Sequence, residues 1–349
     1  MTKRFITALA ATMLLVGTTM PAPAATAASS DQALPSGARE STGYSDLSAS
    51  HWAYGPVTKL REAGVLLPDP SGKFRPDEPV SRAEFLKMLF AARGIDTGSD
   101  CAAFFSDAAC WAWYTPVVET AYRMAIDDGR GNGRFDPDGQ VTRQELVDTL
   151  IRVLGQRRQA ETLSSGEVAA SLKQLSDRGQ IADSARPAVA LALRKGLVSG
   201  RGDGTFRPGV PASRAEAAAI VSRVLLASDV RKTVSREGGR ALDSGDTAAV
   251  DGRVIHFKQA FKLTASMYSS GEPGVGSWTA TGIRVRPGTV AVDPNVIALG
   301  SLLYVEGYGY AIAADTGGAI KGNRIDLYTA SYDQAIDFGM QSRRVWLLP

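Results

Sequence analysis

Three aspartates in the C-terminal part of the chain are the residues best suited to chemistry. Asp293, Asp315 and Asp326 stand in or at the end of short apolar runs that read VAVDP, AIAAD and IDL. Burying a carboxylate in such a run is costly unless it is paired, hydrogen-bonded or protonated. Three of them in one short segment favour a shared site in which at least one carboxyl has a raised pKa. For each residue taken alone, an ordinary Asp at a strand edge or turn is the alternative.

The same segment predicts a small closed β-barrel with one helix, because short strand-forming runs alternate with Gly and Pro. The late helix is expected to begin after Ser331. The loop that follows Asp315 reads TGGAIKG, and Gly317 and Gly318 would let a ligand approach the backbone closely. The expected strands cover residues 261–264, 288–292, 302–305, 310–314, 324–328 and 344–348.

The sequence offers few residues for other kinds of catalytic site. The histidines are His51 and His256, and neither stands in a recognisable Ser-His-Asp or Cys-His context. Lys and Arg number 39 against 36 Asp and Glu, so the net charge of +3 gives no reason to expect nucleic acid as a partner. We expect no metal and no organic cofactor.

The elements of the N-terminal part come from three copies of a two-part motif. A GxFxP loop is followed closely by the pattern S/T-R-x-E in each copy. The phenylalanines are 61 and then 71 residues apart, and the arginines repeat both spacings. The residues concerned are Phe74, Phe135 and Phe206, and Arg82, Arg143 and Arg214.

Each part of the motif predicts a local structure. The Gly permits a tight turn, the Phe fills the core and the Pro stiffens the exit. The Ser/Thr and Glu form a capping box that begins a helix, and apolar residues at helical spacing follow. Another short helix is expected upstream of each Phe, over residues 56–63, 116–124 and 187–195.

The arginine in the second place of each capping box is not needed for capping. Free N–H groups and a guanidinium at the first turn of a helix form a natural anion site, whereas a cation there slightly opposes the helix dipole. This favours a ligand-binding role for Arg82, Arg143 and Arg214. The alternative is an ordinary solvated arginine.

Two further features accompany these motifs: the openings YSD and FSD at residues 44–46 and 105–107, and the aromatic stretches HWAY and CWAW. Together, over about residues 41–227, these features resemble the S-layer homology (SLH) family. The resemblance implies an all-α, three-repeat, pseudo-trimeric bundle. It also implies that grooves between repeats bind an anionic, pyruvylated secondary cell-wall polysaccharide. The family's groove tryptophans fall on Trp52 and Trp111, and its ligand-binding arginines on Arg82, Arg143 and Arg214.

Repeat three departs from this pattern. Its slot near Ala185 has no Trp, and its opening is either residues 175–177 (LSD) or residues 181–183 (IAD). Its groove is therefore expected to be degenerate, and Arg214→Ala is expected to weaken wall binding less than Arg82→Ala or Arg143→Ala.

Over about residues 260–348, Asp293, the DTGGAIKG loop and the RID of residues 324–326 resemble the three-aspartate (3D) domain. The lytic transglycosylase A family, stationary-phase survival proteins and some resuscitation-promoting factors share this domain. The resemblance implies a double-psi β-barrel that cleaves the MurNAc–GlcNAc β-1,4 bond of peptidoglycan. The larger substrate-clamping domain of the transglycosylases has no counterpart here. The implied catalytic residues are Asp326, Asp315 and Asp293, and the implied substrate contacts are Thr281, Gly317, Gly318 and Lys321.

In the implied mechanism Asp326 acts first as acid and then as base, and the muramyl 6-hydroxyl closes onto C1 to give a 1,6-anhydro end. Asp315 would orient Asp326 or help to hold it protonated, and Asp293 would complete the hydrogen-bond frame. One alternative is a hydrolytic muramidase in which Asp315 activates water. The other is a non-catalytic surface-layer or glycan-binding wall protein.

The first 27 residues have the layout of a cleaved signal peptide, with Lys3 and Arg4, an apolar run and small residues after it. An uncleaved membrane anchor is the alternative. We therefore expect a secreted protein at the cell wall, outside the membrane after cleavage. Cys101 and Cys110 are expected to form a disulfide in that compartment, rather than a metal site that lacks two ligands.

These features predict a multidomain chain. The expected boundaries are 1–27 for the signal peptide, 41–96, 100–157 and 172–227 for the three repeats, 228–256 for a linker and 257–349 for the barrel.

Overall fold

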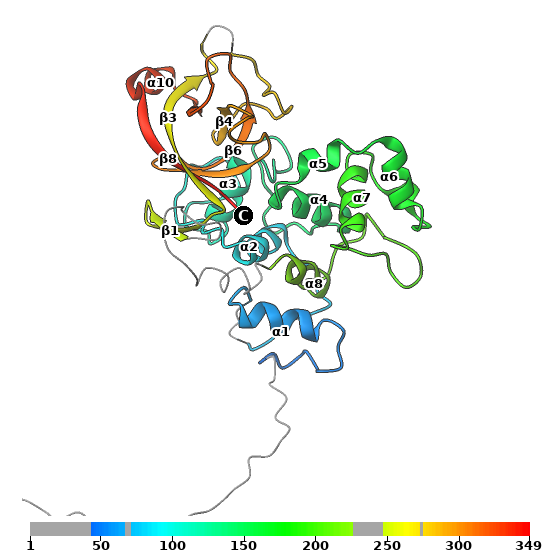
Figure 1. The fold of residues 1–349 in the computed structure, drawn as a ribbon. Coiled ribbons are helices and arrows are strands. Elements are labelled where there is room, and N and C mark those ends of the chain that lie inside the picture. The colour runs from blue at the N-terminus through cyan, green and yellow to red at the C-terminus, as the bar shows by residue number, and fades with distance from the viewer. Residues whose placement is uncertain (1–42, 67–70, 226–246, 273–274) are drawn as a thin grey trace, which may run out of the picture. The chain divides into compact units, whose positions relative to one another are not determined.

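The computed structural model describes residues 43–66, 71–225, 247–272 and 275–349 (Figure 1). The proposed signal peptide and most of the proposed linker lie outside these residues. The described chain is helical in its N-terminal part and forms a closed barrel in its C-terminal part, as predicted. No helix within these ranges is both long and apolar enough to cross a membrane.

Each repeat contributes a pair of helices, and the second helix of each pair begins with a complete capping box at Ser81, Thr142 or Ser213. In each box the hydroxyl accepts the N–H of the Glu three residues on, and the Glu side chain accepts the N–H of the capping residue. The pairs are α1 (Tyr54–Glu62) with α2 (Arg82–Ala92), α3 (Thr115–Arg123) with α4 (Arg143–Val153), and α7 (Arg186–Arg194) with α8 (Arg214–Val224).

The Phe of each GxFxP loop is fully buried, and an aspartate fixes the backbone around it. Asp107 accepts the N–H groups of Phe135 and Asp136 at 2.8 and 2.9 Å. Asp46 holds Phe74 and Arg75 in the same way. These aspartates are the last residues of the YSD and FSD openings. In repeat three Asp177 binds the loop around Phe206, which identifies residues 175–177 as its opening.

The three repeats meet at a closed ring of backbone hydrogen bonds. Val80 N–H donates to Ala212 O at 3.0 Å, Ala212 N–H to Val141 O at 2.9 Å, and Val141 N–H to Val80 O at 3.4 Å. These residues occupy equivalent places, just before each capping box. The ring therefore marks a pseudo-threefold axis, as expected for a pseudo-trimeric bundle.

Two helices that the sequence analysis did not predict lie between repeats two and three. They are α5 (Arg157–Glu161) and α6 (Ser165–Leu172), and a short 3-10 helix, η1 (Arg178–Gln180), follows them. Ser164 and Glu167 form a capping box for α6, so the signal was present in the sequence. This insertion between α4 and α7 accounts for the longer spacing between the second and third copies of the motif.

Residues 247–256, which the sequence analysis assigned to the linker, form a β-hairpin instead. Strands β1 (Thr247–Val250) and β2 (Arg253–His256) pair antiparallel. The turn between them uses Asp251 and Gly252 with positive φ, as a tight two-residue hairpin requires. An Asp-Gly pair between two short runs was the available signal, but the surrounding charge obscured it.

The barrel closes in the order β3-β7-β4-β6-β5-β8, with both parallel and antiparallel pairs. Alternate side chains of its strands form one apolar core that includes Ala265, Ile325 and Val290. The predicted late helix is α10 (Tyr332–Phe338), capped by Ser331. The strands are β3 (Gln259–Ser269), β4 (Thr289–Val292), β5 (Leu302–Val305), β6 (Gly309–Asp315), β7 (Arg324–Thr329) and β8 (Gln341–Leu347).

The predicted disulfide is present. Cys101 and Cys110 are bonded, and their Cα atoms lie 5.4 Å apart. Buried Glu119 accepts the N–H groups of Ala102 and Phe104 at 2.7 and 3.3 Å. The bridge and this carboxylate together hold the segment that precedes α3.

Candidate functional site

Four residues form a row across four neighbouring strands of the barrel. Ser266 of β3 pairs with Asp326 of β7, Asp326 with Ala291 of β4, and Ala291 with Asp315 of β6. Paired residues project from the same face of a sheet. The residues that flank Ser266, Asp326 and Ala291 in their strands fill the core of the barrel, so the row lies on the outer surface. Ala291 forms a low floor between two aspartates.

A β-bulge brings Asp315 into this row. The register between β4 and β6 shifts at Val290 and Ala291, so that Ala313 pairs with Val290 but Asp315 pairs with Ala291. Without the extra residue, Asp315 would follow Ala311 and Ala313 toward the core, where it would be costly to bury. The Cα atoms of Asp315 and Asp326 are two strand spacings apart, roughly 9–10 Å.

The surroundings of Asp326 favour its neutral form. Burial raises the pKa of Asp326 above its ordinary value, and the Glu272 carboxylate acts in the same direction, although the Ser266 hydroxyl and Arg324 oppose it. Ser266 Oγ donates to Asp326 Oδ1 at 2.7 Å. Glu272 is itself held, because its Oε1 accepts the N–H of Ser269 at 2.8 Å. The expected carboxyl with a raised pKa is therefore Asp326.

Asp315 supports the neighbouring turn. Its Oδ1 accepts the N–H groups of Ala280 and Thr316 at 2.9 and 2.8 Å. Within the part of the chain that the structure describes, it makes no hydrogen bond to Asp326. Thr281 lies in this turn, with its hydroxyl 3.2 Å from that of Thr279. The carboxylate thus fixes the wall that carries the predicted sugar contact Thr281.

Asp293 ties the end of β4 to the loop after Asp315. Its Oδ2 accepts Gly322 N–H at 2.7 Å, and its Oδ1 accepts the backbone and side-chain N–H groups of Asn295 at 3.0 Å. These hydrogen bonds, that of Gly322 foremost, lower the pKa of Asp293. These hydrogen bonds hold the Asp293 carboxylate in place and favour its ionised form.

In the loop after Asp315, some residues are needed for packing within the loop and others are exposed to solvent. A Cβ on Gly317 would lie 2.7 Å from Ile320 Cγ1, so the loop itself needs this glycine. Gly318 faces open space, and Lys321 is exposed. Gly318 and Lys321 therefore remain available to a ligand.

Sequence analysis missed Ser266 and Glu272 as members of this site. Ser266 lies in a β-run, where alternation alone would have placed it on the polar face, but nothing local linked it to Asp326. Glu272 lies in a Gly-rich loop without a recognisable motif. Both depend on the pairing of β3 with β7.

The arginines of the capping boxes join neighbouring repeats. Each guanidinium covers the buried Phe of another repeat, at 4.7 to 5.4 Å from the ring centroid. This structural role was not part of the sequence hypothesis. The pairs are Arg82 with Phe135, Arg143 with Phe206 and Arg214 with Phe74.

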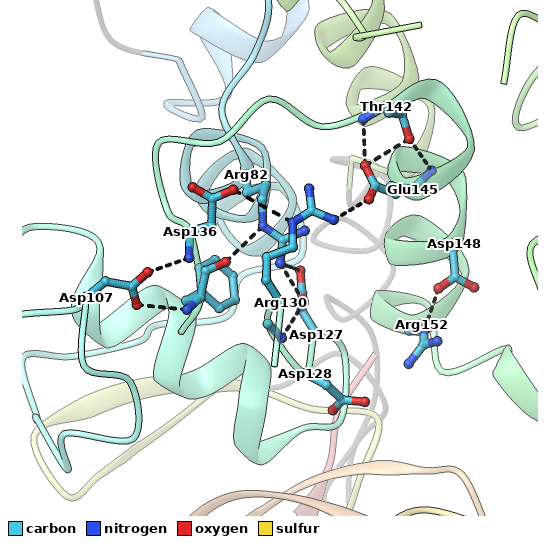
Figure 2. A network of polar contacts seen from close by, with 12 residues as sticks. Arg82, Asp107, Asp127, Asp128, Arg130, Asp136, Thr142, Glu145, Asp148 and Arg152 are labelled. Atoms are coloured by element: carbon cyan, nitrogen blue, oxygen red, sulfur yellow. Dashed lines mark hydrogen bonds and ion pairs between the residues drawn. The ribbon is translucent and has the colours of Figure 1, made fainter. Parts of the chain in front are cut away.

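Arg82 also has an internal counter-ion. Its Nη2 donates to both oxygens of Asp127 at 2.8 and 2.9 Å (Figure 2). The two side chains are only 6% and 14% exposed. Arg143 instead donates to the backbone carbonyl of Ser199 and lies 3.4 Å from Glu216. The charge of Arg82 is thus compensated within the protein.

Among the residues that the structure describes, two grooves between repeats differ in charge. The first, here the Trp52 groove, holds a 60% exposed tryptophan and four arginines against two carboxylates. Its charged residues are Arg143, Arg201, Arg207, Arg223, Asp203 and Glu216.

The second, the Arg82 groove, holds three arginines against four carboxylates (Figure 2). The residues that face Arg82 from repeat three are Ala182, Ser184 and Ala185, where the other repeats carry Trp. The Trp-less slot of repeat three therefore belongs to Arg82 and not to Arg214, which corrects the pairing assumed from the sequence. The charged residues are Arg82, Arg130, Arg152, Asp127, Asp128, Glu145 and Asp148.

The third tryptophan position lies near α2. Trp111 is 89% exposed, and Lys87 of α2 lies 4.8 Å from the ring centroid of nearby Trp113. The same helix carries Glu84, which accepts from Arg214 at 2.8 Å. Arg214 thus contacts the helix beside which Trp113 lies, and Trp52 lines a groove together with Arg143.

Family models match both parts of the chain. The S-layer homology domain model matches residues 43–86, 105–147 and 174–218, and the 3D domain model matches residues 288–349. The chain therefore carries three SLH repeats and a C-terminal 3D domain. These matches and the relatives below indicate a location at the cell surface.

Three relatives cover different parts of the chain. The cell wall-binding protein YocH of Bacillus subtilis (strain 168) is 49% identical over 90 residues, which are 25% of this chain and 31% of YocH. The putative cell wall shaping protein YabE of the same organism is 40% identical over 30% of this chain and 27% of its own. The S-layer protein sap of Bacillus anthracis is 26% identical over 52% of this chain and 21% of its own. The chain thus spans less than a third of the length of each relative.

Two solved structures are similar to a smaller part of the chain. MltA from E. coli is 24% identical over 22% of this chain and 29% of its own, with a TM-score of 0.19. The lytic transglycosylase LtgG of Burkholderia pseudomallei is 31% identical over 22% of this chain and 28% of its own, also with a TM-score of 0.19.

Proposed function

We propose that this chain of three SLH repeats and a 3D domain is a wall-anchored lytic transglycosylase that cleaves the glycan strands of peptidoglycan. The observation that carries the proposal is the row on the barrel surface. A half-buried Asp326 with a raised pKa stands beside the low floor of Ala291. A carboxyl with a raised pKa beside an open floor is suited to protonate a glycosidic oxygen. The names of the relatives YocH and YabE agree with a substrate in the wall.

In the proposed step, Asp326 gives its proton to the oxygen of the MurNAc–GlcNAc bond as that bond breaks. The muramyl 6-hydroxyl then adds to C1 and returns a proton to Asp326, which leaves a 1,6-anhydro end. A retaining double displacement would use Asp315 as the nucleophile, with its carboxyl group about 5–5.5 Å from that of Asp326. Here the Cα atoms of the two aspartates are roughly 9–10 Å apart. Asp315 and Asp293 support the walls and the loop.

The placement of Asp326 and Asp315 on either side of Ala291 also suits one competing function. An inverting muramidase holds its two carboxyl groups roughly 6.5–9.5 Å apart, with a water between them. Asp315 would then activate that water, and the product would carry a reducing end. The third candidate function is that of a non-catalytic barrel that only binds glycan.

Product analysis separates these functions. Purified peptidoglycan is digested with the protein, and mass spectrometry distinguishes anhydro ends, reducing ends and intact strands. Asp326→Asn is expected to abolish cleavage, because the amide keeps most of the carboxyl's shape but has no proton to give. Asp333→Asn, a change at an exposed carboxylate on α10, is the matched control and should cleave like the wild type. Anhydro products from folded Asp326→Asn at the wild-type rate would refute the assignment.

For the anchor, we propose that the Trp52 groove binds the anionic secondary wall polysaccharide. Its excess of arginines and its exposed ring suit an anionic sugar, since guanidinium groups pair with carboxylates and a ring face packs on a sugar. The Arg82 groove lacks both the ring and the excess of positive charge. We therefore expect the Trp52 groove to bind the polysaccharide more tightly than the Arg82 groove does.

A further inference from the structure

The hydroxyl of Ser266 makes one hydrogen bond within the described structure, and it is with the proposed acid. This hydroxyl donates to Asp326 Oδ1 at 2.7 Å from the paired position of the neighbouring strand. Among the residues that the structure describes, the other oxygen, Oδ2, has no hydrogen-bond partner. The two oxygens of Asp326 are therefore not equivalent.

We propose that Ser266 is a positioning residue that reserves Oδ1 of Asp326 and leaves the transferable proton on Oδ2. The inference rests on the proposed glycan cleavage and goes beyond it. Because Oδ1 already accepts a hydrogen bond from Ser266, the neutral carboxyl carries its proton on Oδ2. That proton passes to the glycosidic oxygen, and the electron pair of the broken C1–O bond stays with the leaving oxygen. The muramyl 6-oxygen bonds to C1, and its proton returns to Oδ2.

Between these two transfers Asp326 is a carboxylate in a site that disfavours charge. Burial and Glu272 raise the pKa of Asp326 and so favour its neutral form, whereas a hydrogen bond from Ser266 stabilises the ionised form. Glu272 cannot relax freely, because Ser269 N–H holds it. Ser266 thus stabilises Asp326 when it is ionised, between the two proton transfers, while Glu272 favours the neutral form that precedes the first transfer.

Ser266→Ala tests this role in the full-length protein. Carboxyl carbon NMR should show the pKa of Asp326 rising by about one unit, since a charge-assisted hydrogen bond is lost. The descending limb of the cleavage-rate profile should move to higher pH by the same amount. The maximum kcat should fall about tenfold while KM stays within twofold, because substrate binding does not use this hydroxyl.

A matched pair guards against a purely structural effect. Ser266→Thr keeps the hydroxyl, so the pKa of Asp326 and the kcat should be close to those of the wild type. Ser266→Val has nearly the shape of the threonine variant but no hydroxyl, so it should behave like the alanine variant. If the valine and threonine variants titrate alike, or if the alanine variant keeps the wild-type pKa and pH limb, the inference is wrong. A wild-type protein that cleaves no glycan would instead refute the proposed function on which it rests.

Discussion

Replacing Trp52 with alanine tests whether the Trp52 groove is the wall-binding site. The ring is 60% exposed, so of the roughly 250 Å² that a tryptophan can bury, about 150 Å² is open to a ligand. A sugar ring packed on one face would cover about half of that area, near 75 Å². At about 25 cal/mol per Å² this contact contributes about 1.9 kcal/mol, which is a 20- to 30-fold change in Kd.

The assay is equilibrium sedimentation of the secreted protein with purified sacculi, at constant salt. Trp52→Phe keeps an aromatic face and should lose only part of the affinity. Ser184→Ala changes the equivalent slot of the Arg82 groove and should bind like the wild type, because no aromatic platform is lost there. All variants should lose binding when the secondary polysaccharide is stripped from the sacculi.

Two results would refute the reasoning. If Trp52→Ala binds within twofold of the wild type, the exposed ring carries no ligand. If Ser184→Ala loses as much affinity as Trp52→Ala, the Arg82 groove is a binding site in spite of its compensated charge. Thermal unfolding of each variant checks that the exposed substitutions leave the fold intact.

Two further predictions concern stability. Arg82→Ala should lower the free energy of unfolding by about 3 kcal/mol, because it leaves Asp127 enclosed without its partner; urea unfolding that is unchanged would contradict this packing role. Replacing Cys101 and Cys110 with serine should cost about 2.6 kcal/mol, the chain-entropy value for a loop with a sequence separation of 9. Thiol titration of the secreted wild type should find neither cysteine free.

Most of the repeat architecture could be predicted because its causes are local. A capping box needs only two residues three positions apart, and Ser81 with Glu84 forms one wherever the helix begins. The buried Phe135 and its turn follow from a five-residue motif. The predicted upstream helices differ from the observed ones by one or two residues, as in 116–124 against Thr115–Arg123.

The functions of the arginines could not be predicted in the same way. A guanidinium at a helix start suggested an anion site, but Arg82 covers Phe135 and pairs with Asp127. Both partners lie in repeat two, about fifty residues along the chain. The cycle of backbone hydrogen bonds through Val80, Val141 and Ala212 determines which repeats lie next to each other. No motif within a single repeat contains this information.

The strand and helix segments of the barrel can be located from the residue pattern along the chain, and so can the three aspartates at the ends of, or within, apolar runs. The pairing of the strands, in contrast, is what places Asp326 and Asp315 on either side of Ala291 and brings Ser266 to Asp326. The contact between Asp293 and the loop at Gly322 likewise depends on the folded chain. Alternation along a strand is a local property, whereas strand order and register are fixed by hydrogen bonds between distant segments. The bulge beside Ala291 turns Asp315 outward by inserting a single residue into β6. The residue pattern of one strand does not show which strand it pairs with, so this bulge could not be predicted from the sequence.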